Sequence, residues 1–299
     1  MDCRSPKRAC CARAMLDKQL WGPRDFVRTP SDRNYYIWGR IGDHNVVIAW
    51  LPAGKKGSTS PAATTLPMLA FIPQIRIGLL VGIGAGISKP NKGRDIHLGD
   101  VAVSQPHGNT GGVIQYDQFK AKPGGQREGA AFLNNRPDAY HETELPEMLE
   151  YLEEAIARKP ILAREGYVHQ GFKNDRLFKT LDPKTEIQRV PRDLTDPQIH
   201  YGTIASGNTI SKDGAYRDEL LAATGEECIC FEMEAAGLMN EFPCVVIKGI
   251  SDYADLHKSE KWHRYAAITA AAYAKELLHH LPCQDLETTQ KAVNNLEKS

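Results

Sequence analysis

The stretch Phe231–Asp255, FEMEAAGLMNEFPCVVIKGISDYAD, decides the fold class of this chain. It contains the apolar run Cys244–Ile250, which is short enough to be a buried parallel strand. A second short apolar run, Cys228–Phe231, comes just before it, and both runs end on acidic residues. In open α/β sheets, ligands bind beyond the carboxyl ends of the strands. The stretch therefore predicts an α/β sheet with acidic side chains where a ligand would bind.

The acidic residues have two interpretations. Glu232 and Glu234 follow the first run, and Asp252 follows the second. At a ligand site, such carboxyl groups bind a sugar diol and supply a proton. Acidic residues are also common at the start of helices, because they interact favourably with the helix dipole. Their spacing alone leaves both interpretations open.

Composition excludes several classes of protein. The chain has 299 residues, 41% of them hydrophobic, and a formal net charge of zero. A core of this size with dispersed charges predicts no nucleic-acid partner and no membrane-surface partner. No apolar run approaches the roughly 18 residues of a membrane span, and charged residues interrupt any signal region near Cys3. The seven cysteines form no CxxC pair, which predicts a reducing, cytoplasmic location.

Further along the chain, predicted strands alternate with predicted helices. Residues 35–51 read as two strands around a turn at Gly42 and Asp43. Residues 105–140 and 170–198 are polar excursions. The other predicted strands are 75–83, 100–104 and 201–205, and the predicted helices are 62–71, 144–158, 213–224 and 262–281. With no repeat and no long linker, this order predicts one α/β domain with a mixed sheet.

The motifs FEMEAAG (231–237) and KGISDYAD (248–255) resemble the signature of the nucleoside phosphorylase superfamily. The chain looks similar to fungal phosphorylase-like domains and to methylthioadenosine/adenosylhomocysteine nucleosidases. The other matching blocks are GRIGDHNVVIAWLPAGKKG, LLVGIGAGI, DIHLGDVAVSQP, GGVIQYD, HYGTIASGNTISKDGAYRDEL and AAITAAAYAKELL.

The resemblance covers residues 14–282, which we take as one nucleoside phosphorylase-like domain. It implies a single central mixed β-sheet flanked by helices. Residues 1–13 look like a degraded first strand, and residues 283–299 form a polar tail. Because the relatives assemble as dimers or larger rings, we expect a homo-oligomer.

The resemblance also implies the roles of the central motif. Glu234 matches the glutamate that accepts the ribose 2′- and 3′-hydroxyls, and Met233 matches the methionine on the ribose face. Asp252 matches the general acid at purine N7. Such an acid must hold or share a proton near neutral pH, a state that partial burial favours. Glu234 and Asp252 are thus the predicted catalytic residues.

The glycine run 82–86 suits either a close approach of the backbone to a ligand or a tight turn. In the resembling family this segment lies beside the ribose and the nucleophile, and residues 208–211 read the base. Lys248 matches an arginine near the water site, although a structural salt bridge explains a lysine equally well. The predicted substrate-binding residues are Gly84, Ala85, Ile210, Ser211, Glu232, Met233, Lys248 and Ser251.

Two further matches concern the nucleophile. Leu80 and Ile83 occupy the positions where phosphorylases of this superfamily carry phosphate ligands. A phosphate without polar partners would be costly to bury, so water is the predicted nucleophile. However, Arg8 stands where nucleosidase relatives have a glutamate that activates water. The group that orients the water is therefore left open.

The sequence predicts a purine nucleosidase that hydrolyses the N-glycosidic bond of ribonucleosides such as adenosine or inosine to free base and ribose. Its partner would be a small-molecule purine nucleoside. No cofactor is expected, and the histidines form no HExxH-like metal set. The alternatives are a purine nucleoside phosphorylase and a non-catalytic nucleoside-sensing or signalling module.

Overall fold

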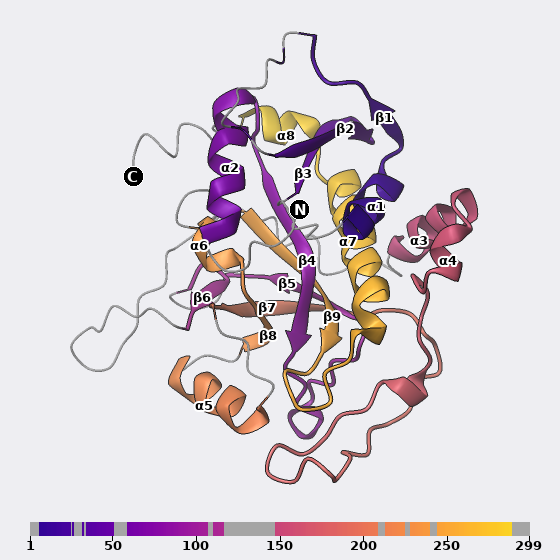
Figure 1. The fold of residues 1–299 in the computed structure, drawn as a ribbon, viewed down its shortest axis with the longest axis vertical. Helices are drawn as coiled ribbons and strands as arrows, with labels where there is room; N and C mark the ends of the chain where they lie inside the picture. The colour runs from indigo at the N-terminus through magenta and orange to yellow at the C-terminus, as the bar shows by residue number, and fades with distance from the viewer. Residues whose placement is uncertain are drawn as a thin grey trace, which may run out of the picture.

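The central feature of the computed structural model is a six-stranded mixed sheet with the order β5-β9-β4-β8-β7-β6 (Figure 1). The model describes residues 6–24, 26, 32, 34–50, 59–106, 110–116, 147–208, 213–224, 228–239 and 244–288. The strands of this sheet are β4 (Gly78–Gly86), β5 (Val101–Ser104), β6 (Val113–Gln115), β7 (Ile199–Ser206), β8 (Cys228–Glu232) and β9 (Cys244–Asp252).

Strand directions in this sheet are mixed. Strands β4 and β9 are parallel, whereas β9 pairs antiparallel with β5 and β4 pairs antiparallel with β8. An additional parallel pairing joins β5 to β7, so the sheet curls back on itself. The predicted α/β class with a mixed central sheet is confirmed.

A smaller three-stranded sheet lies beside the first. It consists of β1 (Lys18–Leu20), β2 (Tyr35–Ile41) and β3 (His44–Trp50), in that order. Strands β2 and β3 form the predicted hairpin, with Gly42 in the left-handed region at a φ of 53°. The separation into two sheets was not predicted.

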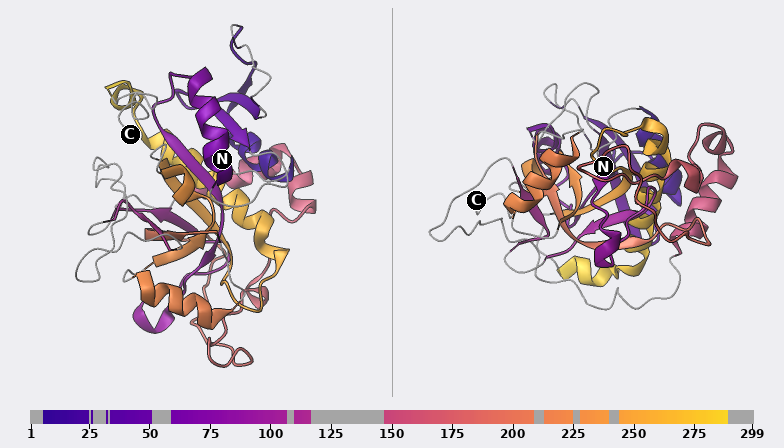
Figure 2. Two further views of the ribbon diagram at one scale, coloured as in Figure 1. Left: turned by 60° about the vertical axis from the view of Figure 1, so that its left-hand side comes forward. Right: turned by 90° about the horizontal axis from the view of Figure 1, so that it is seen from below.

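The helices are α1 (Pro6–Met15), α2 (Thr59–Phe71), α3 (Met148–Arg158), α4 (Ile161–Arg164), α5 (Gly214–Thr224), α6 (Ala235–Met239), α7 (His263–His280) and α8 (Cys283–Thr288). Figures 1 and 2 show α7 alongside β4 and β9, with α2 and α6 on the other side of β4. Helix α7 contains many alanines and lies very close to β9. A Cβ at Gly249 of β9 would lie 1.7 Å from Ala266 O of α7. None of the described helices combines the length and apolar character of a bilayer span.

Three expectations are corrected. The predicted degraded first strand, residues 1–13, is wrong, because helix α1 begins at Pro6. The run of Ala, Arg and Cys in this helix contains no β-branched residue, and Cys11 and Met15 are buried. The predicted tail starts with a helix, α8. The first polar excursion contains the short strand β6, which adds to the edge of the sheet beside β7.

The second excursion, residues 170–198, is anchored by buried charges. Arg192 Nη1 lies 2.7 Å from Asp100 Oδ1, and His200 Nε2 lies 2.8 Å from Asp100 Oδ2. Burial alone would raise the pKa of Asp100, but hydrogen bonds from His200 and Arg192 outweigh it and lower the pKa to about 2. Asp100 therefore ties the excursion to the sheet as a carboxylate.

Replacing Asp100 by Asn is expected to lower the free energy of unfolding at pH 7 by about 2 kcal/mol. This is the free energy that corresponds to lowering the Asp100 pKa from 3.8 to about 2. A lowered pKa stabilises the fold above the unfolded pKa, so the difference from wild type should shrink as the pH falls from about 4 towards 2. Urea unfolding across this range measures it. Asp193→Asn, at an exposed position of the same excursion, is the control. A difference independent of pH would contradict the assignment.

Candidate active site

The strand order brings the two acidic motifs to one end of β4. Ala85 of β4 pairs with Phe231 of β8 on one side and with Asp252 of β9 on the other. Glu232 is the last residue of β8, so the glutamates and the aspartate flank Ala85 from opposite sides. The carboxyl ends of the parallel strands β4 and β9 meet here, as expected of a ligand site.

Lys248 is a buried ammonium between two carboxylates. Its Nζ lies 2.9 Å from Glu232 Oε2 and 3.3 Å from Glu234 Oε2, and its side chain is fully buried. The pairing of β4 with β9 sets Gly82 opposite Lys248, and a Cβ on Gly82 would lie 3.3 Å from Nζ. Glycine at this position leaves room for the ammonium. With all three groups ionised, the cluster carries one excess negative charge.

The two glutamates have different environments. The Glu232 carboxylate also accepts hydrogen bonds from the backbone N–H groups of Glu234 and Ala235 at 3.0–3.1 Å, so it starts helix α6. Ser206 assists by accepting a bond from Ala236 N at 2.8 Å. Glu234 has the longer contact with Lys248 and is 5% exposed. Glu232 thus holds the local structure, while Glu234 is the carboxylate better placed for a ligand.

The glycine run belongs to a strand and not to a turn. Gly82, Gly84 and Gly86 all lie within β4. A Cβ on Gly84 would lie 2.4 Å from Cys230 Sγ and 2.9 Å from Phe231 O. The tight-turn interpretation is therefore wrong, because the close packing of β8 on β4 accounts for glycine at position 84.

Asp252 is held by three neighbours. Its Oδ1 accepts a hydrogen bond from Ala254 N at 3.0 Å, and its Oδ2 lies 3.0 Å from the Ser251 hydroxyl. Lys258 Nζ lies 3.1 Å from the same Oδ2. These contacts fix the carboxyl plane and set a positive charge beside the predicted general acid. Sequence reasoning missed Lys258, because nothing distinguishes it locally from other surface lysines.

The backbone after Asp252 is fixed by the second excursion and by α5. The Tyr253 hydroxyl lies 2.6 Å from Asp175 Oδ1, and Arg189 donates to that hydroxyl at 3.0 Å. Arg217 Nη1 donates to Tyr253 O at 2.8 Å. Burial raises the pKa of Tyr253 well above its usual value, so the group remains a hydroxyl. Ala254 takes a left-handed φ of 51°, so this network holds a strained turn beside Asp252.

The remaining predicted residues fall into two groups. Ser251 is buried at the site, where its hydroxyl also lies 3.2 Å from Gly84 O, and Met233 is half-buried. Ile210 and Ser211 lie outside the described residues. Asp255, three residues after Asp252, accepts a hydrogen bond from His257 N at 2.8 Å.

The positions concerned with the nucleophile are also located. Leu80 is buried and Ile83 packs against the core, both within β4, so neither is a polar ligand. Arg8 lies in helix α1. In the described part of the chain, no group of three or more His, Cys, Asp or Glu residues is arranged to hold a metal ion.

Two curated relatives share sequence with the chain. An NLR-like (nucleotide-binding leucine-rich repeat) protein of Hyaloscypha variabilis is 41% identical over 293 residues, which cover 92% of this chain and 28% of the relative. ATP nucleosidase Cap17 of Escherichia coli is 25% identical over 242 residues, which cover 79% of this chain and 41% of the relative. The chain thus spans well under half the length of these proteins. No family model matches it.

Solved structures show the same fold. Futalosine hydrolase of Helicobacter pylori matches with a TM-score of 0.53 and 18% identity, covering 93% of this chain and 95% of that one. The 5′-methylthioadenosine/S-adenosylhomocysteine nucleosidase of Neisseria meningitidis matches with a TM-score of 0.53 and 15% identity, covering 93% and 96%. The chain therefore has the fold of the nucleoside phosphorylase superfamily, as its sequence motifs predicted.

Proposed function

We propose that the chain is an N-glycosidic hydrolase that releases the base from a purine ribonucleoside or its 5′-substituted form. One observation carries this proposal: Glu234 follows the carboxyl end of β8 and Asp252 ends β9, on the two sides of the carboxyl end of β4. An acceptor for sugar hydroxyls on one side and an acid for the base on the other are what glycosidic cleavage needs. The relative named as an ATP nucleosidase supports the same reaction class.

In this mechanism, the bond between the anomeric carbon and the purine breaks as positive charge develops on the sugar ring. Glu234 accepts hydrogen bonds from the ribose hydroxyls, and its negative charge interacts more strongly with the cationic transition state than with the substrate. Asp252 delivers or shares a proton at purine N7, which makes the base a better leaving group. Lys248 holds Glu234 in place at 3.3 Å.

Glu234→Gln is expected to impair ribonucleosides more than 2′-deoxyribonucleosides. Losing a hydrogen bond to a charged group should cost roughly 1.5–3 kcal/mol, and the deoxy substrate already lacks part of that bond. The measurement compares kcat/KM for adenosine and 2′-deoxyadenosine in wild type and variant, with Glu219→Gln on the exposed face of α5 as control. Equal losses on both substrates would remove Glu234 from the ribose-binding role.

Added phosphate is expected neither to accelerate the reaction nor to enter the product. Leu80 and Ile83 offer no polar group to a phosphate dianion, whereas a water molecule needs only backbone partners. Initial rates of base release with and without inorganic phosphate measure this. A rate that rises in proportion to phosphate, with ribose 1-phosphate as product, would replace the hydrolase by the phosphorylase alternative.

Two relatives favour specific forms of this proposal. The E. coli relative favours a 5′-triphosphate substrate, so base release from ATP and from adenosine should be compared side by side. The NLR-like relative favours a role of the reaction, or of nucleoside binding alone, within signalling. Binding without any release of base would support the non-catalytic sensing module. We also propose a cytoplasmic location and a homo-oligomeric assembly. Size-exclusion chromatography with light scattering tests the assembly.

A further inference from the structure

Tyr253 directly follows the proposed general acid and is anchored at two points. Its hydroxyl lies 2.6 Å from Asp175 Oδ1, and its backbone carbonyl accepts a hydrogen bond from Arg217 Nη1 at 2.8 Å. The residue is buried. A buried side chain that is closely packed and bonded at its polar end has little freedom to move. The position of Tyr253 is therefore set by groups outside its own loop.

Asp175 is itself held by charged neighbours. His97 Nδ1 lies 2.6 Å from Asp175 Oδ2, and Arg189 Nη2 lies 3.0 Å from Asp175 Oδ1. Burial alone would raise the pKa of Asp175, but hydrogen bonds from His97 and Tyr253 and the charge of Arg189 outweigh it and lower the pKa. Asp175 is thus a buried carboxylate with partners on both oxygens, which suits it to hold the Tyr253 hydroxyl.

His97 ties this carboxylate to the segment that leads into β5. Its other ring nitrogen, Nε2, lies 3.1 Å from Asp95 Oδ2, and its backbone N–H donates to Asp100 Oδ2 at 2.8 Å. A carboxylate only accepts hydrogen bonds, so a ring nitrogen bonded to one acts as a donor. Because both ring nitrogens of His97 face carboxylates, the orientation of the ring is fixed from two sides. The support beneath Tyr253 thus joins residues 78 positions apart in the chain.

The turn after Tyr253 transmits this rigidity to Asp252. Ala254 has a left-handed φ of 51°, a conformation that a residue with a Cβ keeps only where its surroundings impose it. In this conformation its N–H donates to Asp252 Oδ1 at 3.0 Å. If the turn relaxed, this donor would move and the carboxyl group could rotate. The anchored Tyr253 therefore keeps one oxygen of Asp252 in place.

We propose that Tyr253, braced by Asp175, is a positioning residue that orients Asp252 for proton transfer to the purine. The inference rests on the proposed function, in which Asp252 delivers that proton. Tyr253 acts through the turn, so its effect falls on the chemical step and not on binding of the sugar. A misplacement of about 1 Å in a catalytic group can cost roughly 10²-fold in rate. Tyr253→Phe keeps the ring and removes only the anchored hydroxyl, so it should misplace Asp252 without unpacking the core.

The test compares two substrates that differ in their need for an acid. The purine of adenosine needs a proton in order to leave, whereas the nitrophenolate of para-nitrophenyl riboside leaves as a stable anion. We expect Tyr253→Phe to lower kcat for adenosine by about 10–10²-fold, with little change in KM, and to leave kcat for the nitrophenyl riboside within about twofold. Asp175→Asn, which removes the charge that holds the hydroxyl, should give the same pattern.

A double variant tests whether Tyr253 acts through Asp252. In the Asp252→Asn background the acid is already absent, so Tyr253→Phe should cause no further loss with adenosine. Losses that multiply in the double variant, or equal losses on both substrates, overturn the proposal, because they would show general damage to the site.

Hydrogen exchange of the Ala254 amide, followed by NMR, gives a readout that does not depend on turnover. It should be at least about tenfold faster in Tyr253→Phe than in wild type, because the bond to Asp252 is released more often. Unchanged exchange overturns the proposal. If the wild-type protein releases no base from any purine compound, the proposed function fails, and the exchange result still decides whether Tyr253 holds Asp252.

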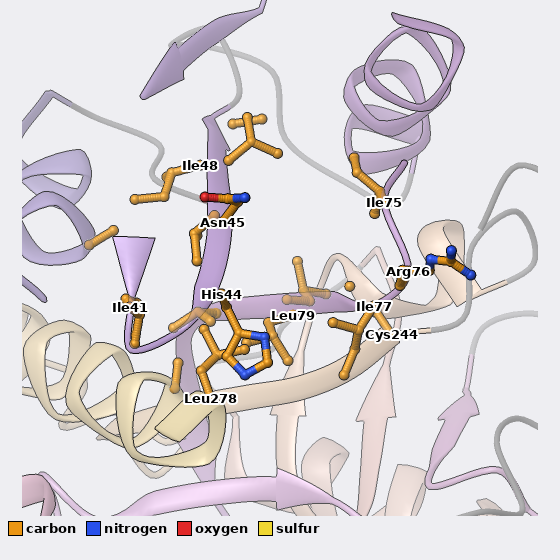
Figure 3. A pocket seen from close by; sticks show the side chains of 18 of the residues that line it. Ile41, His44, Asn45, Ile48, Ile75, Arg76, Ile77, Leu79, Cys244 and Leu278 are labelled. Atoms are coloured by element: carbon orange, nitrogen blue, oxygen red, sulfur yellow. The ribbon is translucent and has the colours of Figure 1, made fainter. Parts of the chain in front are cut away.

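Two control variants separate positioning from a loss of stability. Tyr265→Phe removes another buried tyrosine hydroxyl, which lies 3.4 Å from Thr195 O of the same excursion. Leu278→Ala shortens a buried side chain beside the cavity of about 410 Å³ at the other end of β4 (Figure 3), so it destabilises the fold away from Asp252. Both controls should keep the wild-type ratio of kcat between the two substrates. If Tyr253→Phe also keeps that ratio, the proposal is wrong.

Discussion

Asp252→Asn is expected to lower kcat for base release by about 10²–10⁴-fold, with a much smaller change in KM. The amide keeps the shape of the carboxyl group and one acceptor oxygen but cannot transfer a proton. Because departure of an unprotonated purine is poor, the loss falls on the chemical step rather than on binding. Steady-state kinetics with adenosine and with ATP measure both parameters.

Asp255→Asn is the matched control for this variant. Asp255 lies in the same loop and accepts a hydrogen bond from His257 N, but it has a local role in the turn. Its replacement should leave kcat within a few-fold of wild type. If Asp252→Asn behaves in the same way as this control, Asp252 is not the general acid.

Lys248→Met is expected to lower the free energy of unfolding by about 3–5 kcal/mol, the usual effect of removing one partner from a buried ion pair. The variant leaves Glu232 and Glu234 buried with no ammonium between them. Urea unfolding at pH 7 measures the change. Adding Glu234→Gln to this variant should recover part of the loss, because it removes one of the two buried negative charges.

Lys261→Met provides the comparison at the surface. Lys261 Nζ bonds to Asn174 Oδ1 in an exposed position, where such contacts contribute roughly 0–1 kcal/mol. If the Lys248→Met and Lys261→Met variants have the same free energy of unfolding, the buried cluster does not stabilise the site. Such a result would also weaken the argument that Lys248 holds Glu234.

Local patterns predicted the elements that form the candidate site. Strands β8 and β9 are buried on both faces, so their short apolar runs and the acidic residues after them are visible in the sequence. The alternation of strands and helices similarly predicted the fold class. The ends of these apolar runs thus indicated where Glu232, Glu234 and Asp252 lie.

Contacts between distant residues could not be predicted in this way. Asp175 and Arg189 come from a segment without regular periodicity, yet both contact Tyr253, the neighbour of Asp252. Nothing near Arg192 indicates that it pairs with Asp100 across the fold. Such ion pairs depend on the three-dimensional arrangement and leave no spacing signal.

In the N-terminal region, the local sequence gives a better prediction than the resemblance does. The resemblance suggested a degraded strand, whereas the local composition of residues 6–15 favours a helix, and α1 forms there. The missing pairing between β3 and β4 is likewise a property of the whole topology. The sequences of the two strands do not show this, because residues 35–51 read as a hairpin and residues 75–83 as a buried strand.

The central claim is that the site between Glu234 and Asp252 transfers the glycosyl group of a purine compound to water. Chromatography of the products from adenosine, inosine, guanosine, uridine and ATP, in phosphate-free buffer, tests it most directly. We predict free purine base together with ribose or its 5′-phosphorylated form, and no release of uracil. Failure to release base from any purine compound in the absence of phosphate would contradict the claim.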